Sequence, residues 1–220
     1  MTAVPTPPPA VEAVGIDKRF GSTVALDDVG IRVESGEVHA LVGRNGAGKS
    51  TLVSILTGMR TADRGSVAFS GEPAPPAQDR AAWRRLVACV YQRSTAVPHL
   101  TVAENLFLNR QSEGAAPIRW SALRARAGNL LEQYGVAVRP DAAVADLTVE
   151  QRQLVEIARA LSGGARFIIL DEPTAQLDAP AIERLFDRMR ALQDDGVTFL
   201  FISHHLLEEY EGCQSVTVYR

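Results

Sequence analysis

The chain has few cysteines, no long apolar run and no excess of basic charge. Its 220 residues include two cysteines, Cys89 and Cys213, which are too few for a disulfide framework and lack the spacing of metal ligands. The formal net charge of −3 provides no positive surface for a phosphate backbone, so we expect no nucleic-acid partner. No apolar run approaches the roughly 18–20 residues that cross a bilayer. These absences favour a reducing compartment, and they predict that any link to a membrane is made through another protein.

The chain is 46% hydrophobic and long enough for one substantial domain or a core with an inserted lobe. Residues 1–12 are expected to form a disordered leader, because the first ten are rich in proline and uncharged. Between residues 93 and 160 there is no convincing β-rich run, and two capping-box patterns, at Thr101 and Thr148, predict helices there. We therefore expect an α/β core at residues 13–92 and 161–220, interrupted by a helical subdomain at residues 93–160.

One stretch near the start of the core matches a phosphate-binding loop at every fixed position of G-x-x-x-x-G-K-[ST]. It lies between an apolar run and a helix-like segment, as this loop requires, so a chance glycine-rich turn is disfavoured. The glycines let backbone N–H groups converge on an anion, Lys49 can reach the outer phosphates, and Ser50 can bind Mg²⁺. The residues of the loop are Gly43, Arg44, Asn45, Gly46, Ala47, Gly48, Lys49 and Ser50, followed by Thr51.

Two adjacent carboxylates, Asp171 and Glu172, follow the apolar run at residues 167–170. Packing alone does not explain them, because unpaired buried charge is costly. In a chain with a phosphate-binding loop, Asp171 can hold the Mg²⁺ that binds the phosphates, and Glu172 can orient or deprotonate an attacking water.

Three further side chains have both a functional and an ordinary interpretation. Phe20 precedes the phosphate-binding loop and can stack on a base or pack against a sheet edge. Gln92 ends a β-rich run and can contact a metal-bound water or serve as a loop residue. His204 follows the buried strand expected at residues 197–202, at the edge where α/β sheets bind ligands, and can contact the γ-phosphate or lie in solvent.

The order and spacing of these motifs resemble the nucleotide-binding cassette of ABC transporters. In that family the loop just described is Walker A, Gln92 is the Q-loop, residues 167–172 are Walker B, Asp178 ends the D-loop and His204 is the H-switch. The resemblance implies a P-loop NTPase core of the α/β class, with a mostly parallel sheet, flanking helices, an N-terminal antiparallel β portion and an inserted α-helical subdomain. It implies ATP and Mg²⁺ as cofactors, with Phe20 stacking on the base. It also implies Ser50, Gln92 and Asp171 as metal ligands, and Lys49, Gln92, Glu172 and His204 as catalytic residues.

Within that family, the chain is most similar to the first cassette of bacterial simple-sugar importers. The likeness lies in residues 100–105, 155–158 and 202–204. Such proteins usually carry two cassettes, so we expect this chain to be a fragment or a shortened relative. The resemblance implies a second cassette, from the same chain or a homodimer, membrane permease subunits and, indirectly, a solute-binding protein as partners. It also implies a place at the cytoplasmic face of the cell membrane.

The signature segment departs from the family pattern L-S-G-G-Q, which closes over the ATP held by the other cassette. Thr148 keeps a hydroxyl, but Val149 and Glu150 add side chains where the backbone approaches closely, and Glu150 brings a negative charge toward a polyanion. Alternatively, Glu150 only stabilises the first turn of a helix. We therefore predict two unequal ATP sites, with hydrolysis favoured at this chain's own Walker A. The segment is Leu147, Thr148, Val149, Glu150 and Gln151.

Two other functions are considered beside an ATPase that powers solute import. A cassette that binds ATP for assembly or regulation has only Glu150 in its favour, and Asp171, Glu172 and His204 speak against it. A soluble ABC-type ATPase acting outside transport would be expected to carry basic insertions or a coiled-coil arm, and the sequence has neither.

Overall fold

The computed structural model describes residues 7–108, 118–203 and 212–219. Its centre is a five-stranded sheet in which every neighbouring pair is parallel. In spatial order the strands are β6 (Val87–Val90), β7 (Phe167–Asp171), β8 (Thr198–Ser203), β3 (Val38–Gly43) and β9 (Ser215–Tyr219). A parallel sheet needs cover on both faces, and its strands are accordingly rich in apolar residues.

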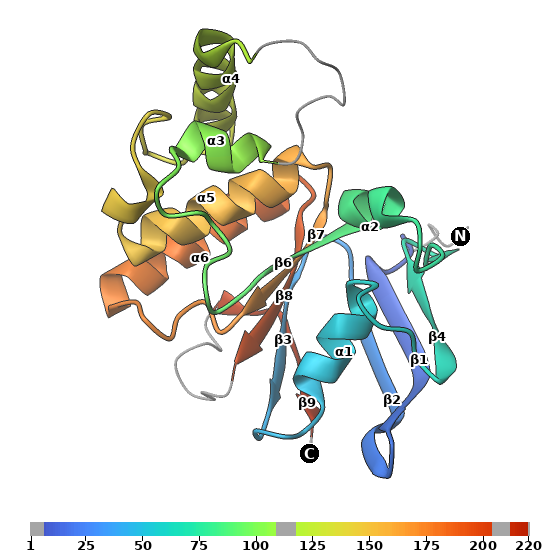
Figure 1. Ribbon diagram of the computed structural model, residues 1–220. Helices are drawn as coiled ribbons and strands as arrows, with labels where there is room; N and C mark the ends of the chain where they lie inside the picture. Colours follow the sequence, from blue (N-terminus) through green and yellow to red (C-terminus); the bar gives the residue numbers. More distant parts are fainter. Residues whose placement is uncertain (1–6, 109–117, 204–211, 220) are drawn as a thin grey trace, which may run out of the picture.

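An antiparallel sheet lies beside the parallel one (Figure 1). Its strand order is β2 (Thr23–Val33), β1 (Val11–Phe20), β4 (Arg64–Phe69) and β5 (Glu72–Pro73). The strand β1 takes in Val11 and Glu12, which the sequence analysis assigned to the leader, because both residues pair with β2 and with β4. Val11 and Glu12 are therefore part of the antiparallel sheet, and residues 1–6 of the predicted leader lie outside the described residues.

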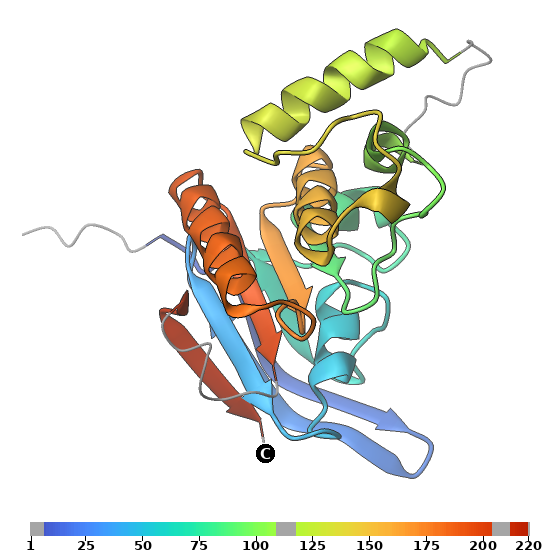
Figure 2. The same cartoon turned by 90° about the vertical axis from the view of Figure 1, so that its left-hand side faces the viewer.

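The parallel sheet buries apolar side chains on both faces. On β7, Ile168 and Leu170 belong to a cluster with helix α6 (Ala179–Asp194), whereas Phe167 and Ile169 belong to a cluster with helix α1 (Lys49–Leu56). This alternation follows from the two-residue period of a strand. Figure 2 shows α6 and α1 on opposite sides of the sheet. The α1 cluster also includes the inner side chains of β1 and β2, so the antiparallel sheet shares this core.

The remaining helices are α2 (Arg80–Leu86), α3 (Val102–Phe107), α4 (Trp120–Gln133), the 3₁₀ helix η1 (Val144–Asp146) and α5 (Val149–Ser162). Both predicted capping boxes are confirmed: Thr101 caps α3 with Glu104, and Thr148 caps α5 with Gln151. In the described part of residues 93–160 there is no named strand, only an isolated bridge between Thr101 and Ala143.

Apolar side chains of α3, α4 and α5 lie in the same cluster as those of α6 and the parallel sheet. The helical region therefore packs on the core and does not have a separate hydrophobic centre. The exact division at residues 93 and 160 stays a prediction. None of the helices in the described residues is long and apolar enough to cross a membrane.

Candidate active site

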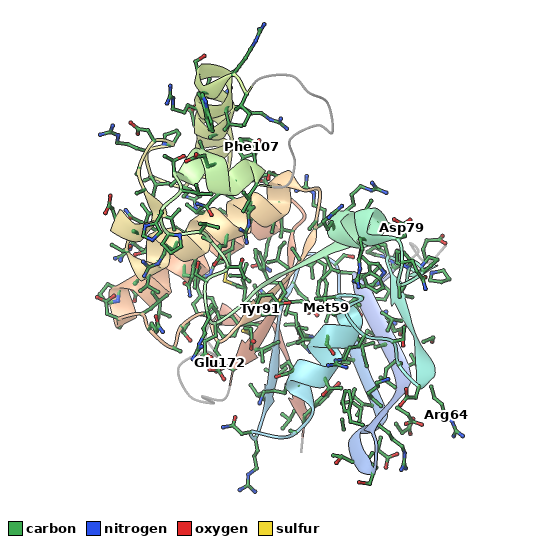
Figure 3. The ribbon with its side chains drawn as sticks, in the orientation of Figure 1. Met59, Arg64, Asp79, Tyr91, Phe107 and Glu172 are labelled. Carbon is green, nitrogen blue, oxygen red and sulfur yellow. The ribbon has the colours of Figure 1, made fainter. Side chains whose placement is uncertain are left out.

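The phosphate-binding loop, Gln92, Asp171 and Glu172 lie at the carboxyl ends of strands of the parallel sheet. The phosphate-binding loop follows β3, Gln92 follows β6, and Asp171 and Glu172 lie at the end of β7. Because β6, β7, β8 and β3 are parallel neighbours, these segments meet at one edge of the sheet. Figure 3 shows Glu172 and Tyr91 at the side of the molecule where β6 and β7 end. His204 lies outside the described residues, directly after β8.

The phosphate-binding loop has a backbone that ordinary residues rarely adopt. Gly46 and Gly48 have φ values of 87° and 88°, in the left-handed region that favours glycine. A Cβ atom at Gly48 would also lie 2.6 Å from the carbonyl oxygen of Ala25 on β2. The backbone at Gly48 therefore lies against β2, too close for a side chain at that position, and continues directly into α1.

Helix α1 begins at this loop with a positive end. No side chain in the described residues caps its first turn, and that turn contains no acidic residue. The first N–H groups of a helix carry a partial positive charge and bind anions. An anion that enters the loop would therefore meet the start of α1 directly.

Lys49 is buried within the phosphate-binding loop. Its Nζ donates hydrogen bonds to the carbonyl oxygens of Gly43, at 2.5 Å, and Arg44, at 3.3 Å. An ammonium group has three protons, so these two bonds leave one for a further acceptor. The loop thus holds its cation in place before any phosphate is bound.

The carboxylates Asp171 and Glu172 lie side by side in an unfavourable setting. Burial raises the pKa of Asp171, the Glu172 charge raises it further, and Lys49 acts in the opposite direction. Glu172 itself has a φ of 50°, a left-handed conformation that is uncommon for a residue with a side chain. Its backbone N–H donates to the carbonyl oxygen of Ile202 on β8, at 2.9 Å, which fixes this conformation. Residues in such sparsely populated conformations cluster at functional sites, although Asp28 on β2 and Ser70 after β4 have φ values of 49° and 50° as well.

Gln92 contacts Glu172 across 80 residues of sequence. The Nε2 atom of Gln92 donates a hydrogen bond to Oε2 of Glu172 at 2.8 Å. Of the two interpretations from the sequence, this contact favours the functional one, because the amide meets the carboxylate predicted to handle water. Gln92 is exposed, so the pair lies at the surface of the sheet edge.

The residues predicted to hold Mg²⁺ offer three kinds of oxygen: the hydroxyl of Ser50, the amide of Gln92 and the carboxylate of Asp171. Mg²⁺ prefers oxygen ligands, and it is often bound by one or two carboxylates together with substrate phosphates and water. A cation would also relieve the repulsion that raises the pKa of Asp171. Among the described residues, no group of three or more His, Cys, Asp or Glu side chains could hold a metal. The oxygen donors predicted from the sequence are of the kind that suits an ion shared with phosphates.

Phe20 ends the strand β1 and is 40% exposed. The guanidinium of Arg60 lies 4.9 Å from the centre of its ring, and Nζ of Lys18 lies 5.8 Å from it. The ring of Phe20 is therefore only partly covered by the protein. Packing against the sheet edge, one of the two interpretations from the sequence, accounts for part of its surroundings. Its role in stacking on a base stays a prediction.

The signature segment forms the start of α5. Thr148 is the N-cap residue, and its Oγ1 accepts from the backbone N–H of Gln151 at 3.2 Å. Glu150 lies in the first turn and forms two hydrogen bonds with the guanidinium of Arg184 on α6, at 2.9 Å and 2.7 Å. The Glu150 charge is therefore compensated within the chain, by a contact that the sequence does not indicate.

Asp178, the predicted end of the D-loop, is the N-cap residue of α6. Its carboxylate accepts from the backbone N–H of Ala181 at 2.9 Å.

A buried carboxylate that no motif in the sequence indicates connects α5 to the segment after Gln92. Glu156 is 3% exposed, and its Oε1 accepts from the backbone N–H and from Oγ1 of Thr95, both at 2.8 Å. Arg159 completes its surroundings with an ion pair at 3.4 Å. One turn earlier on α5, the Gln153 amide donates to the carbonyl oxygen of Pro173. Helix α5 is thus bonded to the segments that follow both Gln92 and Glu172.

Replacing Glu156 with alanine is expected to lower the free energy of unfolding by about 1–3 kcal/mol, because the backbone N–H and the hydroxyl of Thr95 lose their acceptor in two partly buried hydrogen bonds. The check is urea unfolding at pH 7. The control, Glu132→Ala at an exposed position of α4, should change the free energy of unfolding by less than about 0.5 kcal/mol. Equal and small losses in the two variants would show that Glu156 does not hold this segment.

The comparison with known proteins agrees with this geometry. The sequence model of a family described as ABC transporter matches residues 26–175. The ribose import ATP-binding protein RbsA 1 of Rubrobacter xylanophilus is 46% identical over 212 residues, which cover 96% of this chain and 42% of that protein. RbsA of Rhodococcus jostii is 41% identical over 219 residues, covering 99% of this chain and 44% of that protein. The chain thus spans less than half the length of these curated relatives.

A solved structure shares the fold over nearly the whole chain. The ADP conformation of MJ1267, an ATP-binding cassette of an ABC transporter, is 29% identical, with a TM-score of 0.83. The likeness covers 96% of this chain and 87% of that one. The expected fold class, a P-loop NTPase core with a parallel sheet and an added antiparallel sheet, is confirmed. By its sequence and by its fold, the chain belongs to the ABC transporter family, as an ATP-binding cassette of the ABC ATPase type.

Proposed function

We propose that this chain binds and hydrolyses ATP to power the import of a solute, a simple sugar, by an ABC transporter. The observation that carries the proposal is the Gln92–Glu172 hydrogen bond, which joins the Q-loop to the carboxylate beside Asp171, at the sheet edge where the phosphate-binding loop begins. Support for the solute comes from relatives at 41–46% identity that are named ribose import ATP-binding proteins.

In the proposed reaction, Lys49 and the start of α1 bind the outer phosphates, with the backbone of residues 43–51 around them. Ser50, Asp171 and Gln92 would hold Mg²⁺, which would supply positive charge to neutralise the phosphates. Glu172 orients the water that attacks the γ-phosphorus and accepts its proton, so that ADP leaves. Phe20 stacks on the base, and His204 contacts the γ-phosphate.

The proposed cycle needs a second cassette. Residues 147–151 of each cassette cover the ATP that the other one holds, and the loop ending at Asp178 lies beside the same interface. ATP draws the two cassettes together and hydrolysis lets them part. The helical region at residues 93–160 passes this motion to permease subunits at the cytoplasmic face of the membrane, which receive the sugar from a solute-binding protein.

The test is to measure ATP binding and phosphate release by the purified chain with Mg²⁺. We expect the chain to bind ATP and to turn it over slowly, because its site lacks the partner's signature segment. Turnover should rise when a second cassette and the permease subunits are added. Failure to bind ATP would overturn the proposal, and rapid turnover that does not depend on protein concentration would overturn the shared site.

A further inference from the structure

The Glu150–Arg184 ion pair joins the first turn of α5 to the second turn of α6. Glu150 is the second residue of α5, two positions after the N-cap Thr148, and Arg184 is the sixth residue of α6, whose N-cap is Asp178. The guanidinium donates from Nε to Oε1 and from Nη2 to Oε2, at 2.9 Å and 2.7 Å. This two-point contact sets the direction of the carboxylate as well as its distance.

The ion pair lies at the surface and not in the core. The Arg184 side chain is 58% exposed and that of Glu150 is 17% exposed. Both residues line a surface cavity together with Thr148 and Gln151. The Glu150 carboxylate raises the pKa of Arg184, so the guanidinium keeps its charge.

The proposed function requires that the Glu150 charge be neutralised. It places the triphosphate of the other cassette against residues 147–151, where a free carboxylate would repel it. In the structure, the Glu150 carboxylate is instead directed to α6 and neutralised. The Thr148 hydroxyl uses an oxygen lone pair in its capping bond from Gln151, so its proton stays available for a phosphate oxygen.

We propose that Arg184 is a positioning residue that makes this signature segment compatible with a bound triphosphate. It holds the Glu150 carboxylate against α6 and cancels its charge, so that the start of α5 can approach the nucleotide of a second cassette. This role rests on the proposed function, and it assigns to Arg184 the neutralisation of the Glu150 charge in the signature segment.

The test measures ATP-dependent association of the full 220-residue chain by sedimentation velocity. All proteins carry Glu172→Gln, which is expected to let the ATP-bound form accumulate. Adding Arg184→Ala should weaken association about tenfold, because Glu150 is then unpaired. Adding both Arg184→Ala and Glu150→Ala should restore it, and Arg184→Lys should give an intermediate value since it keeps the charge but not the two-point contact.

Two measurements separate this role from a merely structural one. The effect of Arg184→Ala should shrink between about 0.05 M and about 0.5 M salt, since charge repulsion is screened and lost packing is not. Binding of ATP to the monomer should be unchanged. The matched control is Arg190→Ala, which removes an arginine of similar exposure from the same helix, where it pairs with Asp187. It should associate like the parent.

The outcomes distinguish the inference from the function beneath it. If the parent protein does not associate with ATP present, the sharing of sites between two copies of this chain is wrong, and the inference falls with it. If the parent associates but Arg184→Ala has no effect, the inference alone is wrong. It is also wrong if the double variant stays as weak as Arg184→Ala, because Arg184 would then act independently of Glu150.

Discussion

Replacing Glu172 with glutamine is expected to slow ATP hydrolysis about a hundredfold or more, while ATP binding is retained. A positioned general base contributes roughly 10²–10⁴-fold to a rate, and an amide cannot accept the proton of the attacking water. Glutamine has the same shape as glutamate and keeps an oxygen that can accept from Gln92, so the contact at 2.8 Å can persist. The measurement is phosphate release together with a binding titration of ATP, for the wild-type chain and the variant under the same conditions.

The matched control is Glu183→Gln at an exposed position of α6, which should leave the rate unchanged. It makes the same chemical change and removes the same charge, but away from the sheet edge. The proposed role of Glu172 would be wrong if its variant, in the assembled transporter, hydrolysed ATP as fast as wild type. A loss of ATP binding equal to the loss of rate would show that Glu172 mainly supports the loop.

Replacing Lys49 with alanine is expected to weaken ATP binding about a hundredfold, because a charge-assisted hydrogen bond to the phosphates and the positive charge beside them are lost. In the structure, Lys49 donates to the carbonyl oxygens of Gly43 and Arg44. The variant therefore also loses an internal support of the loop. The affinity is measured by calorimetry with MgATP.

Adenosine separates these two effects of the Lys49 substitution. It carries no phosphate, so its weak binding should depend little on the ammonium group. A variant that loses affinity for ATP alone has lost a phosphate contact, as proposed. If ATP and adenosine were weakened by the same factor, the substitution would have disordered the site, and the phosphate-binding role of Lys49 would lack support.

Much of the site could be predicted from the sequence because its parts are local. The phosphate-binding loop needs glycines at particular positions, and the φ values of Gly46 and Gly48 show that two of them adopt a conformation other residues avoid. The two capping boxes join residues three apart, so each appears in the sequence as a complete pattern. The end of β7 was predictable because an apolar run stops at two carboxylates.

The sequence by itself thus determined the phosphate-binding loop, the carboxylates that follow β7 and the caps of α3 and α5, since each depends on residues a few positions apart. Only the tertiary structure decided which of these segments meet. Gln92 reaches Glu172 across 80 residues, Glu156 reaches Thr95 across 61, and Glu150 reaches Arg184 across 34. Such pairs leave no local pattern, because their distance is set by the strand order β6-β7-β8-β3-β9 and by the packing of α5 and α6. For that reason Glu150 is an unfavourable charge in the sequence and half of an ion pair in the folded chain.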